Sequence, residues 1–216
     1  MFSARVSRAS RGFCALAMCL MMSFLSVPSA ADSLTPAQAL SQRLSSLDGM
    51  RAGVVQKVYA NGLVLEESQG SFALAKPNLR WQVDTPFPQV IVVTQNELQI
   101  YDEDLAQLTI RDLTDAVSET PADVLMQPER LLSDDYSVTL DRAEAREVYR
   151  LLSNATSALF QRLEIVFAAD IVESLTILDW QSQQTQILFF DVETLSEPAP
   201  NLFELSVPKD TDVIRG

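Results

Sequence analysis

The sequence contains no histidine, only two cysteines and only six glycines. Histidine is the usual general base at neutral pH and the commonest zinc ligand, so its absence removes most support for serine-hydrolase and zinc-hydrolase chemistry. No glycine belongs to a GxxxxGK or GxGxxG motif, and the sequence therefore predicts no phosphate-binding loop. These absences argue against an enzyme and against a bound metal, nucleotide or other cofactor.

Residues 1–31 have the pattern of a secretory signal peptide. Three arginines precede an apolar stretch over residues 13–27, and small residues follow at 29–31. The apolar stretch is too short to be a resident membrane-spanning helix. We expect cleavage after Ala31, which leaves residues 32–216 as the mature chain.

Both cysteines, Cys14 and Cys19, lie in the segment that is predicted to be removed. The mature chain should therefore contain no disulfide and no thiolate metal ligand. Lipid attachment at Cys19 is the competing interpretation. The bulky Met18 before it and the apolar residues beyond it disfavour that interpretation.

Acidic residues outnumber basic ones by 29 to 16, which gives a net charge of −13. Removing the three arginines of the signal peptide leaves 13 basic residues against 29 acidic ones, or −16. Such a surface is repelled by phosphates and by anionic lipid headgroups, which argues against nucleic-acid binding. Two interpretations of the acidity remain. It keeps the protein in solution, or it prevents a carrier of apolar cargo from adhering to the membranes that it visits.

Residues 35–48 have the pattern of an amphipathic helix. Thr35 is a good N-cap, Pro36 suits the first helical position, and Gln38 lies three residues after the cap. An apolar stripe at helical spacing follows, formed by Ala37, Leu40, Leu44 and Leu47. Gly49 is the expected stop.

After Gly49 the pattern changes to short runs rich in β-branched and aromatic residues, separated by turn signals such as Asn61-Gly62. We predict strands at 52–60, 63–69, 71–76, 79–84, 89–95, 97–101, 105–111, 135–140, 146–152, 158–168, 171–179, 184–191 and 202–207. A helical segment at 121–132, which includes Leu125, interrupts them. Residues 32–216 fit one domain with a sizeable core.

These elements predict a mainly β fold with helices (α+β). A long antiparallel meander with few helices suggests a strongly curved sheet, with the helices across one face. Apolar residues that alternate with polar ones should share that covered face. They are Phe72, Leu74, Leu79, Trp81, Val83, Leu98 and Ile100.

Several segments resemble the LolA family of periplasmic lipoprotein carriers. The main one runs over residues 70–83, with its basic-proline corner Lys76-Pro77 and its Arg80-Trp81 step. The other segments follow in the order of that family, at residues 89–93, 101–110, 120–125, 177–187 and 203–214. Together they extend over essentially the whole mature chain.

The resemblance implies an unclosed, strongly curved antiparallel β-barrel, with an α-helical lid over an apolar cavity. It implies a periplasmic carrier in a Gram-negative bacterium. The carrier would receive acylated lipoproteins from an inner-membrane ABC-type release complex and deliver them to an outer-membrane acceptor. On this interpretation the protein is a monomer that binds no nucleic acid and needs no cofactor of its own.

The resemblance also assigns roles to particular residues. The seven alternating apolar residues from Phe72 to Ile100 would line the cargo cavity, although Trp81 on such a strand is equally compatible with plain core packing. The lid would include Leu40, Leu44, Leu47 and Leu125. The family usually has arginine before the corner proline, where it is thought to hold the lid closed. Here Lys76 stands at that place, and Arg80 is the alternative latch.

Two other classes of function remain open at this stage. A related protein of the same fold could bind another acylated or glycolipid cargo, or could sense lipoproteins. The run Asp102-Glu103-Asp104 contains clustered carboxylates such as calcium prefers, but a turn between strands is the simpler interpretation. Paired carboxylates could also serve a glycosidase, yet acidic residues are too abundant in this chain to single out a pair.

Overall fold

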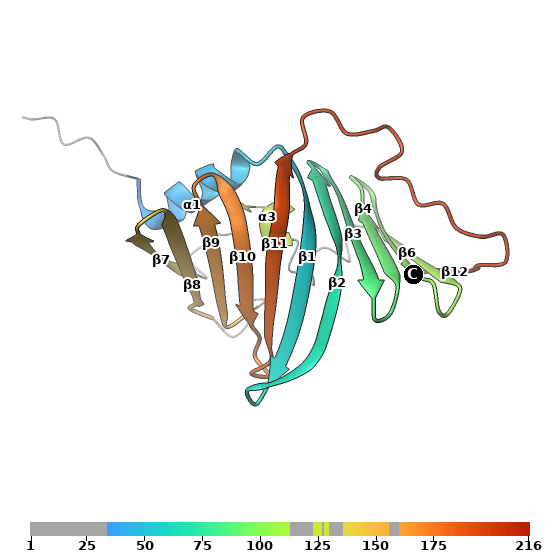
Figure 1. The fold of residues 1–216 in the computed structure, drawn as a ribbon, viewed down its shortest axis with the longest axis horizontal. Helices are drawn as coiled ribbons and strands as arrows, with labels where there is room; N and C mark the ends of the chain where they lie inside the picture. The colour runs from blue at the N-terminus through green and yellow to red at the C-terminus, as the bar shows by residue number, and fades with distance from the viewer. Residues whose placement is uncertain (1–33, 113–122, 127, 130–135, 156–159) are drawn as a thin grey trace, which may run out of the picture. The chain divides into compact units, whose positions relative to one another are not determined.

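The structure is a computed structural model that describes residues 34–112, 123–126, 128–129, 136–155 and 160–216 (Figure 1). The helices are α1 (Pro36–Ser45) and α3 (Asp123–Met126). The strands are β1 (Gly49–Ala60), β2 (Leu63–Ala75), β3 (Asn78–Thr85), β4 (Gln89–Val93), β5 (Glu97–Asp102), β6 (Gln107–Asp112), β7 (Tyr136–Ala143), β8 (Arg146–Ser153), β9 (Arg162–Ala168), β10 (Ile171–Leu178), β11 (Gln184–Thr194) and β12 (Asp212–Arg215). The predicted mainly β fold with helices is confirmed.

All the described strands belong to one sheet in the order β12-β6-β5-β4-β3-β2-β1-β11-β10-β9-β8-β7. β1 lies in the middle, paired with β2 on one side and with β11 on the other. The two outermost strands, β7 and β12, do not pair with each other, so the sheet is unclosed as predicted. The pairing is antiparallel except at one edge, where β12 runs parallel to β6.

Helix α1 begins as the sequence predicts. The side chain of Thr35 accepts from the backbone N–H of Gln38, and the Gln38 side chain accepts from the backbone N–H of Thr35, which is a capping box. The predicted stop is wrong, because the helix ends at Ser45 and Gly49 is the first residue of β1. A Cβ on Gly49 would lie 2.2 Å from the Leu195 carbonyl oxygen, so this glycine permits a close backbone approach.

The β1–β2 hairpin turns at Asn61-Gly62, where both residues have positive φ (52° and 77°), as a two-residue hairpin turn requires. The prediction of two strands at 63–69 and 71–76 is wrong, since β2 is continuous. Gly70 lies between the two predicted ranges. It is the point where β2 comes close to β3, because a Cβ there would lie 1.8 Å from the Gln82 carbonyl oxygen.

One face of the sheet, here called the inner face, forms the main core with α1 and α3. Leu40 and Leu44 of α1 and Leu125 of α3 are almost fully buried against it. The sheet residues of this core include Phe72, Leu74, Leu79, Trp81, Leu98, Tyr149, Leu151, Leu163, Ile165, Phe167, Leu175 and Ile187. Alternation therefore correctly predicted which side chains share the covered face.

The opposite, outer face carries a second buried apolar cluster over β4, β5 and β6. Its buried residues there are Val90, Val92, Tyr101, Leu108 and Ile110. The predicted strand at 202–207 is wrong. This segment forms no strand, and Phe203, Leu205 and Val207 cover the second apolar cluster. The alternation came from contact with the sheet rather than from pairing within it. β4 is continuously apolar because Val90 and Val92 belong to this outer cluster, whereas Ile91 and Val93 face the other side of the sheet.

Four predictions fall wholly or partly outside the described residues. They are the signal peptide, most of the helical segment at 121–132, the first residue of the strand at 135–140, and the start of the strand at 158–168. Of that helical segment the structure describes α3 and a short turn at 128–129. Over the described ranges, no helix has the length and apolar character needed to span a bilayer.

We predict that Gly70→Ala lowers the free energy of unfolding by about 2 kcal/mol or more, because backbone must move to admit the methyl group. Gly53→Ala is the matched control. Its Cβ would meet only the ring of Phe190, which is 48% exposed and can swing aside. Urea unfolding measures both, and an equal loss in the two variants would contradict this account of Gly70.

Candidate functional site

An open groove of about 440 Å³ lies on the inner face of the sheet, over β3 and β4. Its described lining residues are Gln56, Glu66, Ser68, Leu79, Trp81, Val83, Phe87, Gln89, Ile91, Val93 and Asp102. The volume falls in the range of about 300–1,000 Å³ that is typical of small-molecule sites. Strand pleating explains the lining, because alternate residues of β3 and β4 point to this face.

The groove is apolar along its length and polar at one end. Leu79, Trp81 and Val83 of β3 pair with Val93, Ile91 and Gln89 of β4, so these side chains lie in rows across the two strands. The last row continues to Asp102 of β5, and Glu66 and Ser68 of β2 lie beyond the end of β3. Such a groove suits a ligand with an apolar chain and a polar end.

Of the seven predicted cavity residues, Leu79, Trp81 and Val83 line this groove. Phe72, Leu74 and Leu98 do not, because they are buried in the main core, and Ile100 packs against that core. The Phe72 ring contacts the rings of Trp81 and Phe189 edge-on, with centroids 5.7 and 5.5 Å apart. Alternation predicts the face on which a side chain lies. It does not predict whether another side chain fills the space above it.

The structure adds groove residues that the sequence analysis did not single out. Ile91 and Val93 belong to β4, whose continuous apolar run hid their alternation. Phe87 lies in the β3–β4 connection and is 67% exposed. A large aromatic between two prolines, left exposed in a turn, was the available signal.

Lys76 lies in the β2–β3 turn and contacts α1. Its Nζ donates a hydrogen bond to the Leu44 carbonyl oxygen over 2.6 Å. This carbonyl is among the last four of the helix, which lack partners in the regular helical pattern. Burial lowers the pKa of Lys76, and the nearby carboxylates of Asp48 and Glu129 partly offset the effect.

Arg80, the alternative latch, lies on the outer face. It pairs with Ala73 of β2, and its guanidinium donates to the Glu204 carbonyl oxygen (3.4 Å) and to the Gln82 side chain (3.3 Å). None of the hydrogen bonds or ion pairs described for Arg80 reaches α1. Side chains of Lys76 and Arg80 leave the chain on different sides of the sheet, and only Lys76 reaches the helix.

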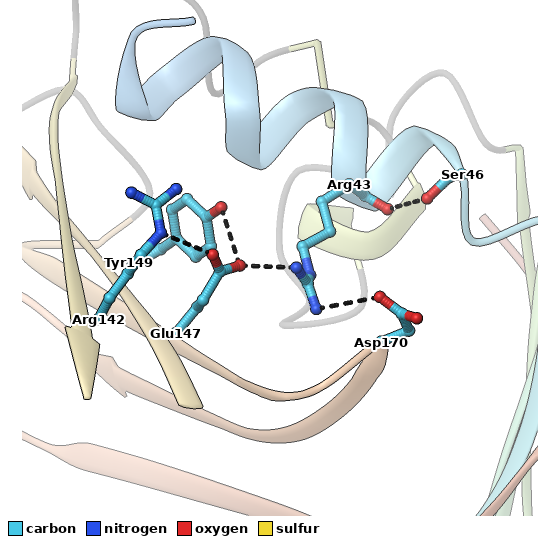
Figure 2. A network of polar contacts seen from close by, with 6 residues as sticks. All are labelled: Arg43, Ser46, Arg142, Glu147, Tyr149 and Asp170. Carbon is cyan, nitrogen blue, oxygen red and sulfur yellow. Dashed lines mark hydrogen bonds and ion pairs between the residues drawn. The ribbon is translucent and has the colours of Figure 1, made fainter. Parts of the chain in front are cut away.

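A second polar contact to α1 was missed by the sequence analysis (Figure 2). Nη1 of Arg43 lies 2.6 Å from Oε2 of Glu147 in β8, and Nη2 lies 3.6 Å from Asp170 in the β9–β10 turn. The same guanidinium lies 4.3 Å from the centroid of the Phe167 ring. Arg43 and Glu147 side chains are only 23% and 24% exposed.

Glu147 is the centre of this network. Besides Arg43 it accepts from Nε of Arg142 in β7 (2.9 Å) and from the Tyr149 hydroxyl (3.5 Å). Burial raises the pKa of Tyr149, and the charge of Glu147 raises it further. The signal in the sequence was Glu147 itself, because it occupies an inward position of the series that continues with Tyr149 and Leu151.

The acidic run at 102–104 forms a turn. Oδ1 of Asp102 accepts from the backbone N–H of Leu105 over 3.0 Å. Within the described ranges, no three histidine, cysteine, aspartate or glutamate side chains are grouped so that they could hold a metal ion. The turn was the simpler of the two interpretations of this run, and the structure shows it.

Comparison with known proteins identifies the family. The family model "Outer membrane lipoprotein carrier protein LolA" matches residues 45–206. The chain therefore belongs to the LolA family. An outer-membrane lipoprotein carrier protein from Chromohalobacter salexigens is 30% identical over 194 residues, which cover 88% of this chain and 92% of the relative. One from Azotobacter vinelandii is 32% identical over 185 residues, or 84% of each chain.

Solved structures support the fold. The crystal structure of an uncharacterized conserved protein from Thermus thermophilus superposes with a TM-score of 0.56 at 15% identity. The match covers 84% of this chain and all of that one. At this level of identity the likeness concerns the fold alone.

The lowered pKa of Lys76 leads to a pH prediction. Lys76 has a lower pKa in the native state than in the unfolded state, so the native state loses this proton at a lower pH. Between that pKa and 10.5 the unfolded state binds more protons, and the free energy of unfolding therefore rises with pH. The free energy of unfolding of the wild type, minus that of Lys76→Leu, should therefore rise with pH in alkaline solution until the pH is above 10.5. Urea unfolding at several pH values measures it. A difference that falls with pH would contradict burial as the main cause.

Proposed function

We propose that this protein carries acylated lipoproteins through the periplasm. The observation that carries the proposal is an open groove with an apolar floor, beside a helix held to the sheet rim by Lys76. The names of the relatives, outer-membrane lipoprotein carrier proteins, support the same cargo. On this proposal the protein acts without catalysis.

The physical need for such a carrier follows from the cargo. Each methylene of an acyl chain gains about 0.8 kcal/mol when it leaves water, and a triacylated lipoprotein carries several tens of them. The acyl chains would lie on Leu79, Trp81, Val83, Ile91 and Val93, and the polar linkage to the protein part would lie toward Glu66 and Asp102. The aqueous crossing then exposes little apolar surface.

The remaining expectations belong to this proposal. The signal peptide at 1–31 would direct the chain to the periplasm. An inner-membrane ABC-type complex would load it, and an outer-membrane acceptor would unload it. The protein would act as a monomer, with no cofactor. Native mass spectrometry of protein purified from the periplasm tests the cargo directly, because a glycolipid in place of acylated lipoproteins would favour the alternative cargo.

We predict that Val83→Glu weakens binding of a synthetic triacylated lipopeptide by about tenfold or more, because a charge in an apolar groove must be desolvated when the acyl chain enters. Val55→Glu is the matched control, since Val55 is also half-buried but pairs with Leu188 and Gln69 away from the groove. A fluorescent lipopeptide and equilibrium titration measure both. Equal affinities in the two variants would place the cargo elsewhere.

We also predict that Lys76→Leu alters cargo transfer and that Arg80→Leu does not. A hydrogen bond from a charged group contributes about 1.5–3 kcal/mol, which is enough to shift a closed helix toward an open state. Transfer of a lipoprotein from spheroplasts to the carrier, and from the carrier to outer membranes, is the measurement. Normal transfer by the Lys76→Leu variant would contradict the proposal that Lys76 holds α1 closed.

A further inference from the structure

The last turn of α1 is held from two directions by neighbouring residues. Arg43 reaches Glu147 in β8 and Asp170 in the β9–β10 turn. Leu44, the next residue, receives the hydrogen bond from Lys76 in the β2–β3 turn. In the order of the sheet, β2 and β8 are separated by β1, β11, β10 and β9. The end of α1 therefore connects two distant parts of the same sheet.

The two contacts are built differently. On the β8 side the Arg43 guanidinium has a carboxylate at 2.6 Å, a second carboxylate at 3.6 Å and an aromatic ring at 4.3 Å. On the β2 side there is a single donor and a single carbonyl acceptor. Guanidinium groups hold a fixed geometry through their planar set of donors, whereas a lysine ammonium is a mobile point charge.

The contact of α1 with β8 is also harder to break than its contact with the β2–β3 turn. Removing Arg43 would leave Glu147 half-buried with Arg142 and Tyr149 alone. α1 also lies against β7, the neighbour of β8 in the sheet.

We propose that α1 opens as a hinged lid, with the Arg43–Glu147 contact as its fixed side and the Lys76–Leu44 contact as the side that releases. Glu147 is then a positioning residue, which keeps the helix on the β7–β10 part of the sheet while the β2–β3 side opens toward the groove. The proposal deepens the carrier function and rests on it. Cargo would enter and leave past the Lys76 side, and α1 would return to the same place after each transfer.

The test uses pairs of spin labels at introduced cysteines in protein purified from the periplasm. Gln42 is an exposed residue of α1, Gln95 is exposed in the β4–β5 turn near the releasing side, and Ala145 is exposed in the β7–β8 turn near the fixed side. Double electron–electron resonance gives the 42–95 and 42–145 distance distributions. The first measurement is made without cargo, and the second with a synthetic triacylated lipopeptide.

Without cargo, Lys76→Leu should broaden and lengthen the 42–95 distribution and leave the 42–145 distribution unchanged. Adding Glu147→Gln to Lys76→Leu should shift both distributions. Glu173→Gln is the matched control for the charge, because the ion pair of Glu173 is with Arg146 and not with a residue of α1. Lys76→Leu with Glu173→Gln should behave as Lys76→Leu alone.

The proposal is overturned if Lys76→Leu shifts both distances alike, or if Glu147→Gln adds no more than Glu173→Gln. Circular dichroism checks that each variant folds. If Glu147→Gln does not, Arg43→Lys takes its place, because it keeps the charge and loses the guanidinium geometry. With lipopeptide, the wild type should lengthen only the 42–95 distance. Failure of every variant to bind lipopeptide would overturn the carrier function, and the cargo-free distances would still decide the hinge.

Discussion

An open sheet with an apolar inner face must be covered, and this constraint shapes the rest of the structure. In the order of the sheet, side chains from β5 across to β8 form one continuous core on that face, and two leucines of α1 complete it. The cover stops short of β3 and β4, where the groove leaves Trp81, Val83 and Ile91 in contact with open space. The groove is thus the part of the inner face that no other segment of the described chain covers.

The polar contacts to α1 follow from the same constraint. Buried leucines hold the helix on the sheet through contacts that have little direction, since apolar packing is proportional to area and weakly oriented. Lys76 and Arg43 fix the position of the helix, because each forms a specific polar contact between the end of α1 and one part of the sheet. Packing keeps the helix on the sheet, and the polar groups determine its position there.

Local signals predicted the local features of this fold. The capping box at Thr35, the hairpin turn at Asn61-Gly62 and the alternation along β2 and β3 could all be read from neighbouring residues. The errors concern contacts between distant segments. Gly49 was expected to end a helix and Gly70 fell between two predicted strands, whereas each accommodates a carbonyl from another strand or segment. Residues 202–207 alternate because they lie on the sheet, and no local pattern distinguishes that from pairing.

The site was predictable to the same extent. Three of the seven expected cavity residues line the groove. The others share the same face of the sheet, but neighbouring side chains such as Phe189 fill the space beside them. Lys76 and the helix end could be matched only through the family resemblance. The Arg43–Glu147 pair joins residues 104 positions apart, and one sequence contains no signal for such a partnership beyond an acidic residue at an inward position.

The parallel pairing of β12 with β6 has a consequence for association between molecules. Without these four residues, β6 would present a free backbone edge, and free edges add strands from other chains. β12 is short and has a charged residue at each end, Asp212 and Arg215, both of which discourage a further strand from joining. The four residues of β12 thereby protect the edge of β6 from pairing with another chain. Such protection suits a protein with an open apolar groove, because it lowers the tendency to aggregate.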